Sequence, residues 1–185
     1  MRRRQPGKSA LPRLWLISDA RNDAQLERSI ARLPLGSGLV FRHYHLAPDA
    51  RHARFDRLAR LMRRRGGVIV LAGDIAAAKA WRADGCYGPP GGGSCLGLIR
   101  LLTAHDMREL ARANATRGTR AQALISPIFA TRTHPGGPSL GAPRFASLAR
   151  LSRLPVIALG GMTPKRARQI AAITNRWAAI DGLSE

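Results

Sequence analysis

Residues 155–164 read PVIALGGMTP, and this stretch contains one complete unit of a parallel β/α protein. The apolar run Pro155–Leu159 has the length and continuous hydrophobicity of a strand that is buried on both faces. Gly160 and Gly161 predict a tight turn at the end of that strand. Thr163 and Pro164 predict the start of a helix, because Thr is a good N-cap and Pro is favoured at the first helical position.

The same succession of short apolar strand and helix recurs along the chain. We predict strands at eight places: Leu14–Ser18, Gly38–Arg42, Val68–Ala72, Gly85–Tyr87, Leu96–Leu102, Ala123–Ile125, Pro155–Leu159 and Trp177–Ile180. About six helices separate them; the clearest contains Phe55 to Met62 and ends at Gly66, and another is expected over Thr103–Asn114. This alternation predicts parallel βαβ units, and eight repeats favour a closed (β/α)8 TIM barrel over an open sheet.

The barrel is expected to be compact and trimmed. The chain has 185 residues, whereas this fold typically takes roughly 200 or more. The segment 89–94, PPGGGS, cannot form a helix or an interior strand and is predicted to replace the helix after the fourth strand. The last helix is also expected to be reduced or missing. Residues 13–185 are predicted to form a single domain, preceded by a basic, flexible tail over residues 1–12.

The charge is strongly positive, with 31 Lys+Arg against 11 Asp+Glu and a formal net charge of +20. A basic surface favours anionic ligands, and nucleic-acid binding is one alternative. It is disfavoured because the arginines are scattered, with local runs at 2–4 and 63–65, and no aromatic residues are interleaved with them. A surface for phosphorylated small molecules is compatible with the same charge.

Other classes are excluded by simple patterns. No apolar run approaches the roughly 18 residues that a membrane helix needs. Cys86 and Cys95 lack the spacing of a zinc site or a disulfide framework. The basic start has no apolar stretch with a cleavage site after it, so it is not a secretory signal. A cytoplasmic protein is therefore expected, and a homo-oligomer is left open.

Two loops have the residue types of a phosphate site. Gly160 and Gly161 would let a phosphate approach backbone N–H groups after the seventh strand, where barrels commonly bind phosphate. The alternative is a tight glycine turn without a ligand. The second loop, SPIFATRTH over residues 126–134, offers the hydroxyls of Thr131 and Thr133 beside Arg132 and His134. Its alternative is a polar surface loop.

Together these motifs resemble the thiamine-phosphate synthase and thiazole tautomerase superfamily over about residues 14–183. The resemblance includes LWLISD (14–19), AGD (72–74) with RADGCYG (82–88), LLTAH (101–105), SPIFATRTHPGG (126–137) and PVIALGGMTP (155–164). It implies a compact (β/α)8 barrel and a transferase of thiamine biosynthesis. In that reaction hydroxymethylpyrimidine diphosphate loses pyrophosphate while the ring nitrogen of a thiazole phosphate captures the pyrimidine methylene group.

The resemblance also implies roles for particular residues. Asp74 matches a Mg2+ ligand, and Thr103 matches a hydroxyl that contacts the diphosphate. Thr131, Thr133, Gly160 and Gly161 match the residues that hold the thiazole phosphate. Ser126 and His134 are further candidates for binding substrate or phosphate, and His134 stands where the family has a Lys. On the second strand, Arg42 and His45 are the candidates to replace the Gln and Lys that the family carries there.

The chain departs from the family at several of these positions. No Asp or Glu occurs between Asp84 and Asp106, so the second Mg2+ carboxylate is absent. Asp181 stands where the family has a Ser near the phosphate, and a carboxylate repels phosphate. Pro127 stands at the catalytic His of the tautomerase branch. A non-catalytic or repurposed barrel that binds a phosphorylated small molecule is therefore the first alternative to a transferase.

Overall fold

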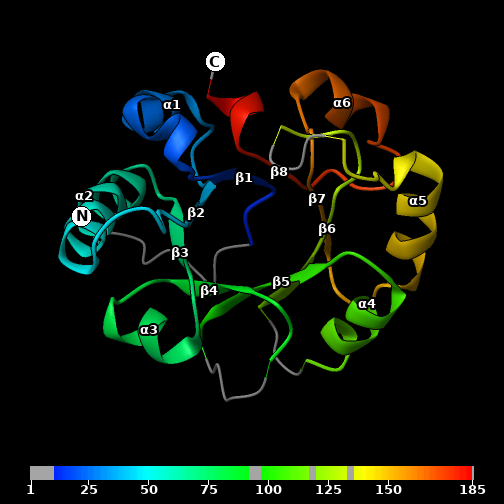
Figure 1. Ribbon diagram of the computed structural model, residues 1–185, viewed down its shortest axis with the longest axis horizontal. Coiled ribbons are helices and arrows are strands. Elements are labelled where there is room, and N and C mark those ends of the chain that lie inside the picture. Colours follow the sequence, from blue (N-terminus) through cyan, green and yellow to red (C-terminus); the bar gives the residue numbers. More distant parts are fainter. Residues whose placement is uncertain (1–10, 92–96, 117–119, 133–135, 185) are drawn as a thin grey trace, which may run out of the picture.

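The computed structural model describes residues 11–91, 97–116, 120–132 and 136–184. Its eight strands are all parallel and form a closed barrel in sequence order (Figure 1). The strands are β1 Leu14–Ile17, β2 Gly38–Phe41, β3 Val68–Ala72, β4 Gly85–Gly88, β5 Ile99–Ala104, β6 Ala121–Ile125, β7 Val156–Ala158 and β8 Trp177–Ala179. Pairing of β8 with β1 closes the sheet. The prediction of a (β/α)8 barrel is confirmed.

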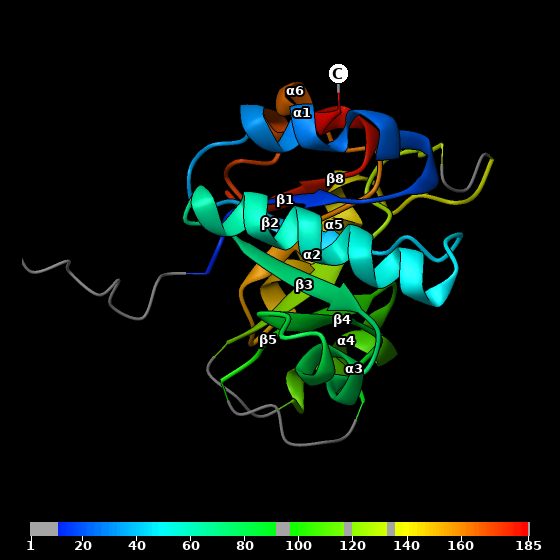
Figure 2. The ribbon, with the colours of Figure 1, turned by 90° about the vertical axis from the view of Figure 1, so that its left-hand side faces the viewer.

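The helices surround the barrel, as the two ribbon views show (Figures 1 and 2). They are α1 Leu26–Arg32, α2 Pro48–Arg64, α3 Ile75–Ala80, α4 Met107–Asn114, α5 Gly141–Leu151 and α6 Pro164–Gln169, with 3-10 turns η1 Ala20–Gln25 and η2 Asp181–Leu183. Between β4 and β5 the described residues 89–91 and 97–98 form no helix. Residues 92–94 of the predicted loop lie outside the described ranges. Among the described residues after β8, the helical element is the short turn η2.

The predicted helix over Thr103–Asn114 is wrong at its start. Thr103 lies in β5, which continues to Ala104, and α4 begins at Met107. The carboxylate of Asp106 accepts the Glu109 N–H at 2.8 Å and caps α4. The fifth strand correspondingly begins at Ile99, three residues later than predicted.

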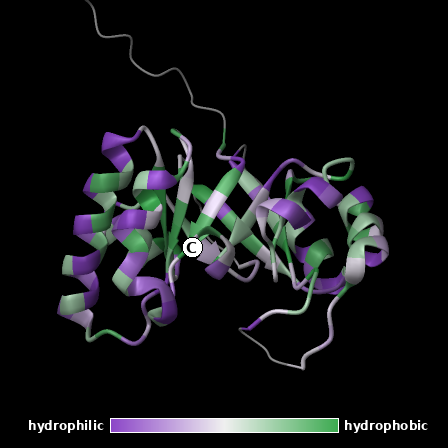
Figure 3. Cartoon of the chain, turned by 90° about the horizontal axis from the view of Figure 1, so that it is seen from above, coloured by the Kyte–Doolittle hydropathy of each residue, from purple (hydrophilic) through white to green (hydrophobic). Residues whose placement is uncertain are grey.

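Apolar side chains form separate layers inside and outside the sheet. The inner layer fills the barrel and contains Trp15, Ile17, Val40, Val70, Ile99, Leu101, Leu124, Ile157 and Ala178. Outside, β1–β3 pack on α1 and α2 through residues such as Leu39, Phe41 and Phe55. A second outer cluster includes Ile125 of β6 and Phe145 of α5. In Figure 3 the helices alternate hydrophilic and hydrophobic residues, as this one-sided packing requires.

Alternation along the strands decides which residues reach the inner rim. Side chains of a strand point to opposite faces in turn. Arg42 therefore continues the inward column of Val40, and Ser126 continues that of Leu124. Because the strands are parallel, these residues follow the carboxyl ends of their strands at the same end of the barrel.

The first described residues, Leu11 and Pro12, are hydrogen-bonded to side chains of the barrel. The indole Nε1–H of Trp15 donates to the Pro12 carbonyl at 3.2 Å, and Arg176 donates to the carbonyls of Leu11 and Pro12. The remainder of the predicted tail, residues 1–10, lies outside the described ranges. Cys86 lies buried in β4, and Cys95 is not among the described residues. Among the helices described, none is long and apolar enough to cross a membrane.

The packing of Trp15 requires a glycine at position 38. This requirement leads to a prediction about stability. The two residues are neighbours in the β1–β2 pairing, and a Cβ at position 38 would lie 2.2 Å from Trp15 Cε3. Trp15 is fully buried and has no room to move away. We expect Gly38→Ala to lower the free energy of unfolding by about 1–3 kcal/mol, measured by chemical denaturation.

Gly88→Ala is the matched control, because a Cβ at position 88 meets nothing within 4 Å. Its effect is expected to stay within about 0.5 kcal/mol. Equal losses in the two variants would contradict the assignment of a packing role to Gly38.

Candidate functional site

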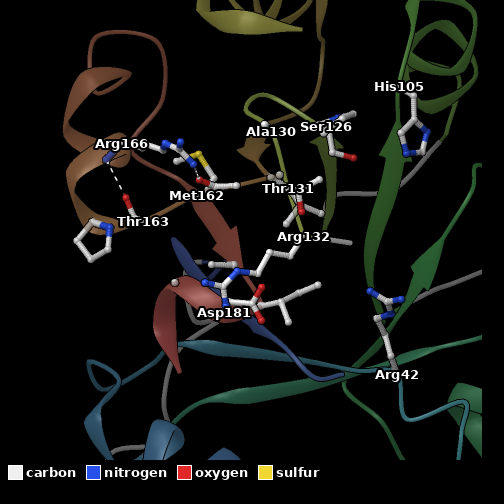
Figure 4. Close-up of a pocket in the computed structure, with 18 of the residues that line it drawn as sticks. Arg42, His105, Ser126, Ala130, Thr131, Arg132, Met162, Thr163, Arg166 and Asp181 are labelled. Atoms are coloured by element: carbon white, nitrogen blue, oxygen red, sulfur yellow. Dashed lines mark hydrogen bonds between the residues drawn. The ribbon is translucent and has the colours of Figure 1, made fainter. Parts of the chain in front are cut away.

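A pocket of about 580 Å3 opens at the carboxyl ends of the strands (Figure 4). Its size is within the usual range for small-molecule sites. The residues that line it come from segments that follow several strands: Arg42, Tyr44, Tyr87, His105, Ser126, Pro127, Ala130, Thr131, Arg132, Leu159, Gly160, Gly161, Met162, Thr163, Pro164, Arg166, Ala179, Ile180, Asp181 and Gly182. Three are arginines and one is a carboxylate, so the fixed charge of the lining is positive.

The glycine turn is shaped by close contact with the loop after β6. Gly160 and Gly161 have φ angles of 95° and 62°, in the left-handed region that favours glycine. A Cβ on Gly160 would lie 2.5 Å from Pro127 Cα, and one on Gly161 would lie 2.4 Å from the Ala130 carbonyl oxygen. The fold therefore requires both glycines even without a ligand.

This turn also leaves backbone donors available. The Gly160 carbonyl accepts the Phe129 N–H at 3.1 Å, which fixes the turn against the β6 loop. Within the described part of the chain, the N–H groups of Gly160, Gly161 and Met162 donate to no acceptor. Consecutive N–H groups around left-handed residues form a concave site that suits an anion.

Arg166 is held beside the turn by three contacts. Its backbone N–H donates to Thr163 Oγ1 at 3.2 Å, and its guanidinium donates to the Gly161 carbonyl. The guanidinium carbon also lies 4.9 Å from the centre of the Phe129 ring. Figure 4 shows Thr163 and Arg166 on the side of the pocket away from Arg42.

Arg42 is fixed through its backbone on both sides. Its N–H donates to Ser18 Oγ at 2.8 Å, and its carbonyl accepts Nε–H of Arg51 at 2.9 Å. Arg51 also donates to the Ala72 carbonyl at 3.0 Å, so it joins the ends of β2 and β3. The Arg51 guanidinium lies over the rings of Phe41, Tyr44 and Trp81.

Behind Arg42, a buried histidine links two segments of the chain. His43 Nδ1 lies 2.7 Å from Ser18 Oγ, and its Nε2 lies 2.7 Å from Asp23 Oδ1. The ionised Asp23 carboxylate can only accept, so Nε2–H donates to it, and in the neutral imidazole Nδ1 then accepts the Ser18 hydroxyl proton. Burial lowers the pKa of His43 despite the opposing effect of Asp23, which fits this neutral form. The network stabilises the left-handed backbone of His43, whose φ is 40°.

The network continues to Arg54. Its guanidinium donates to Asp23 at 2.7 Å and also to Glu27. Burial raises the pKa of Asp23, but the hydrogen bonds from His43 and Arg54 outweigh it and the pKa is lowered overall. The carboxylate is therefore ionised and already has two donors.

The carboxylates near Arg42 have arginine partners. Asp19 accepts Arg21 Nε–H at 2.9 Å, and its other oxygen lies 3.8 Å from Arg42 Nη2. Burial raises the pKa of Asp19, whereas the hydrogen bonds and charge of Arg21, with the charge of Arg42, lower it overall. Asp181 Oδ2 lies 3.4 Å from Arg21 Nη1. Among the residues that line the pocket, Tyr87 has a pKa that burial raises, so its phenol is neutral.

The predicted magnesium ligand does not form a metal site in this arrangement. Asp74 is exposed and absent from the pocket lining, and its Oδ1 accepts the Ala77 N–H at 2.7 Å as the cap of α3. In the described ranges, one set of three metal-type side chains has its donor atoms within 4.8 Å of one another: Asp23, His43 and His45. Arg54 and His43 already donate to Asp23 Oδ1, so a cation there would have to displace a guanidinium. The residues present do not fit bound Mg2+.

The structure gathers part of the predicted site. Arg42, Ser126, Thr131, Gly160 and Gly161 line one pocket. Thr103, Asp74 and His45 do not line it, although Thr103 and Asp74 lie at or just after the carboxyl ends of β5 and β3. His45 is exposed, with its ring 5.2 Å from that of His43. Thr133 and His134 fall outside the described residues. The binding roles of all these residues stay predictions.

Some residues of the pocket were not singled out from the sequence. Tyr87 is the penultimate residue of the short strand β4 and packs on the inner layer, and the alternation of side chains along the strand was a usable signal. Arg166 occupies the first turn of α6, three residues after the predicted cap, and His105 follows β5 directly. The network of Ser18, His43 and Asp23 has no local sequence signal, because its members come from separate segments.

Solved structures resemble this fold over most of its length. Thiamine phosphate pyrophosphorylase from Pyrococcus furiosus matches with a TM-score of 0.71 and 18% identity, covering 92% of this chain and 85% of the other. The enzyme of that name from Bacteroides thetaiotaomicron matches with a TM-score of 0.56 and 15% identity, covering 91% and 82%. A citrate synthase variant matches with a TM-score of 0.61 and 10% identity, covering 92% and 87%. At these identities the likeness shows the fold alone.

A comparison by sequence with curated proteins gives no match. The family model described as thiamine monophosphate synthase matches residues 14–183, which is nearly the whole chain. That range begins with β1 and ends in η2, so it includes every strand of the barrel and every segment that lines the pocket. The chain therefore belongs to the thiamine monophosphate synthase family.

Proposed function

We propose that this protein is a transferase that joins hydroxymethylpyrimidine diphosphate to a thiazole phosphate and releases pyrophosphate. The observation that carries the proposal is one pocket with cationic or N–H donors on two sides, Arg42 on one and the glycine turn with Arg166 on the other. Two separated anion sites are what a reaction between two phosphorylated substrates needs. The family membership supports the same class of reaction.

The glycine turn is the proposed anchor for the thiazole phosphate. The unpaired N–H groups of Gly160 and Gly161 supply donors without a side chain in the way. The hydroxyl of Thr163 lies next to them and lines the same pocket. Ser126 and Thr131 line the pocket from the β6 loop and add hydroxyls to this end.

Arg42 is the proposed partner of the diphosphate. In the reaction the bond between the pyrimidine methylene carbon and the diphosphate oxygen breaks, and pyrophosphate leaves with the electron pair. The thiazole nitrogen forms the new bond to the methylene carbon and becomes positively charged. Charge grows on the leaving oxygen, so a positioned guanidinium stabilises the transition state more than the ground state. The protein supplies no nucleophile, and its contribution is orientation and charge.

Asp181 has two opposite effects in this scheme. Its carboxylate lines the pocket, so it repels the phosphate that the glycine turn would hold. It also offers a negative charge to the thiazolium ring that the reaction forms. The ion pair with Arg21 reduces the carboxylate's effective charge.

A second candidate is a barrel that binds a phosphorylated small molecule without this reaction. The observation that favours it is the use of Asp74 as a helix cap, together with the absence of a second carboxylate between Asp84 and Asp106. A cytoplasmic location and a homo-oligomer stay predictions.

The transferase proposal is tested by product formation. Purified protein is mixed with both phosphorylated precursors, and thiamine phosphate is followed by thiochrome fluorescence while pyrophosphate release is measured in parallel. We expect the two products in equal amounts, and no coupled product when either precursor is omitted. Ligand-induced stabilisation in a melting assay without any product, even at high enzyme concentration, would reject the transferase and favour the second candidate.

The charge of Asp181 gives a prediction about phosphate affinity. Asp181→Asn removes a like charge from the pocket and keeps the shape of the side chain. At the effective dielectric of a partly exposed site, this change is expected to tighten binding of inorganic phosphate by about three- to tenfold, measured by calorimetric titration.

Asp56→Asn is the matched control, since Asp56 is exposed on α2, outside the pocket lining, and loses the same charge. Equal tightening by both variants would mean that only the net charge of the protein matters. Weaker binding in Asp181→Asn would mean that phosphate does not occupy this pocket as proposed.

A further inference from the structure

We infer that the site binds the diphosphate group through arginine, with Arg42 as the principal cation, and without a divalent metal ion. The inference rests on the proposed function, because it names how the same pocket holds its leaving group. It also separates this chain from what its family resemblance implies, namely a Mg2+ ion held by carboxylates.

The first observation is the state of the carboxylates at this end of the barrel. Mg2+ in a phosphate site is usually held by one or two carboxylates together with substrate oxygens. Asp74 caps α3 with Oδ1 and lies outside the pocket lining. Asp19 and Asp181 are both paired with Arg21. Within the described ranges, no two carboxylates line the pocket together.

The second observation concerns the one cluster of metal-type donors that the described residues contain. Asp23, His43 and His45 have the spacing of a metal site, but two hydrogen bonds from Arg54 and one from His43 converge on Asp23 Oδ1. A metal ion would need both a free carboxylate oxygen and a free Nε2 lone pair. The proton on Nε2 leaves that atom without a lone pair, and the Arg54 guanidinium already holds a positive charge against the carboxylate, so the cluster is a structural support for the β2 loop.

The third observation is the way this support holds Arg42. Its N–H and its carbonyl are both hydrogen-bonded to side chains, Ser18 on one side and Arg51 on the other. The side chain itself is about a quarter exposed, and its nearest carboxylate oxygen, on Asp19, is 3.8 Å away. The backbone is thus fixed, while the guanidinium keeps N–H donors that no short ion pair uses. A guanidinium with an anchored backbone and available N–H donors is well suited to bind two oxygens of a phosphate at once.

The fourth observation is the charge of the pocket. Arg132 and Arg166 line it in addition to Arg42, against Asp181 alone. Arg166 is engaged by the Gly161 carbonyl and the Phe129 ring, whereas Arg132 is exposed at the pocket and adds to its positive potential. This chain's own cations therefore supply the charge that the metal supplies in the family scheme.

The test uses inorganic pyrophosphate as the probe and the full-length protein. Its dissociation constant is measured by calorimetric titration, once in buffer with EDTA and once with excess MgCl2. We expect binding in EDTA to be as tight as, or tighter than, binding with Mg2+, because the magnesium complex of pyrophosphate carries less negative charge. Binding that appears only with Mg2+, or no binding of pyrophosphate in either buffer, would overturn the inference.

The Arg42→Ala variant tests whether Arg42 is the residue that binds pyrophosphate. A charged hydrogen bond to an anion contributes about 1.5–3 kcal/mol, so the loss of affinity in EDTA is expected to be about ten- to hundredfold. Arg42→Lys keeps the charge but not the paired N–H groups and is expected to recover part of the loss. Arg60→Ala is the matched control, because Arg60 is exposed on α2 and away from the pocket lining. Equal losses in Arg42→Ala and Arg60→Ala, or no loss in either, would contradict the role of Arg42.

Melting curves of the variants check that they remain folded, which is expected because the backbone of Arg42, and not its side chain, makes the supporting hydrogen bonds. The result is independent of the transferase test. Thiamine phosphate synthesis with strictly Mg2+-dependent pyrophosphate binding would refute this inference and keep the proposed function. Metal-independent pyrophosphate binding without thiamine phosphate synthesis would support this inference and reject the proposed transferase.

Discussion

The pairing of β8 with β1 is the constraint on which the rest of the structure depends. Leu14, Trp15 and Leu16 pair with Trp177, Ala178 and Ala179, and this join turns a row of parallel strands into a closed ring. Every strand then ends at the same rim, so residues more than one hundred positions apart line one pocket, as Arg42 and Asp181 do. The interior is filled mainly by apolar side chains, with Gln122 of β6 as a buried polar residue among them, and the pocket is lined by residues at or after the carboxyl ends of the strands.

Several arginines form contacts inside the fold, so the composition alone is a poor guide to function. Arg51 joins the ends of β2 and β3 through two carbonyls, and Arg176 holds the segment before β1. Arg54 neutralises Asp23 and Glu27 between η1, α1 and α2. Guanidinium groups suit this use because they donate in several directions at once. Such arginines are structural, so a net charge of +20 does not by itself indicate a nucleic-acid surface.

The sequence was sufficient for the barrel because its strands are continuous apolar runs and its turns contain glycine or capping residues. The prediction from the sequence was wrong at the start of α4, because β5 continues through Thr103 and Ala104 and the N-cap of α4 is Asp106. For the pocket, local patterns located Gly160 and Gly161. No local pattern could show that His43 joins Ser18 to Asp23, because that contact exists only once β1, η1 and β2 are placed side by side.

Asp74 shows why a residue type at the right place is weaker evidence than its hydrogen bonds. An aspartate directly after a parallel strand suits both a metal ion and a helix N-cap, and the sequence cannot separate the two. In the structure its Oδ1 accepts the Ala77 N–H, so the carboxylate stabilises α3, whereas the backbone of Arg42 is hydrogen-bonded on both sides and its guanidinium lines the pocket. A guanidinium differs from a metal ion in what it can select, because its N–H groups lie in one plane and have set directions. In the proposed binding mode, the geometry of the diphosphate as well as its charge would determine which ligand this pocket accepts.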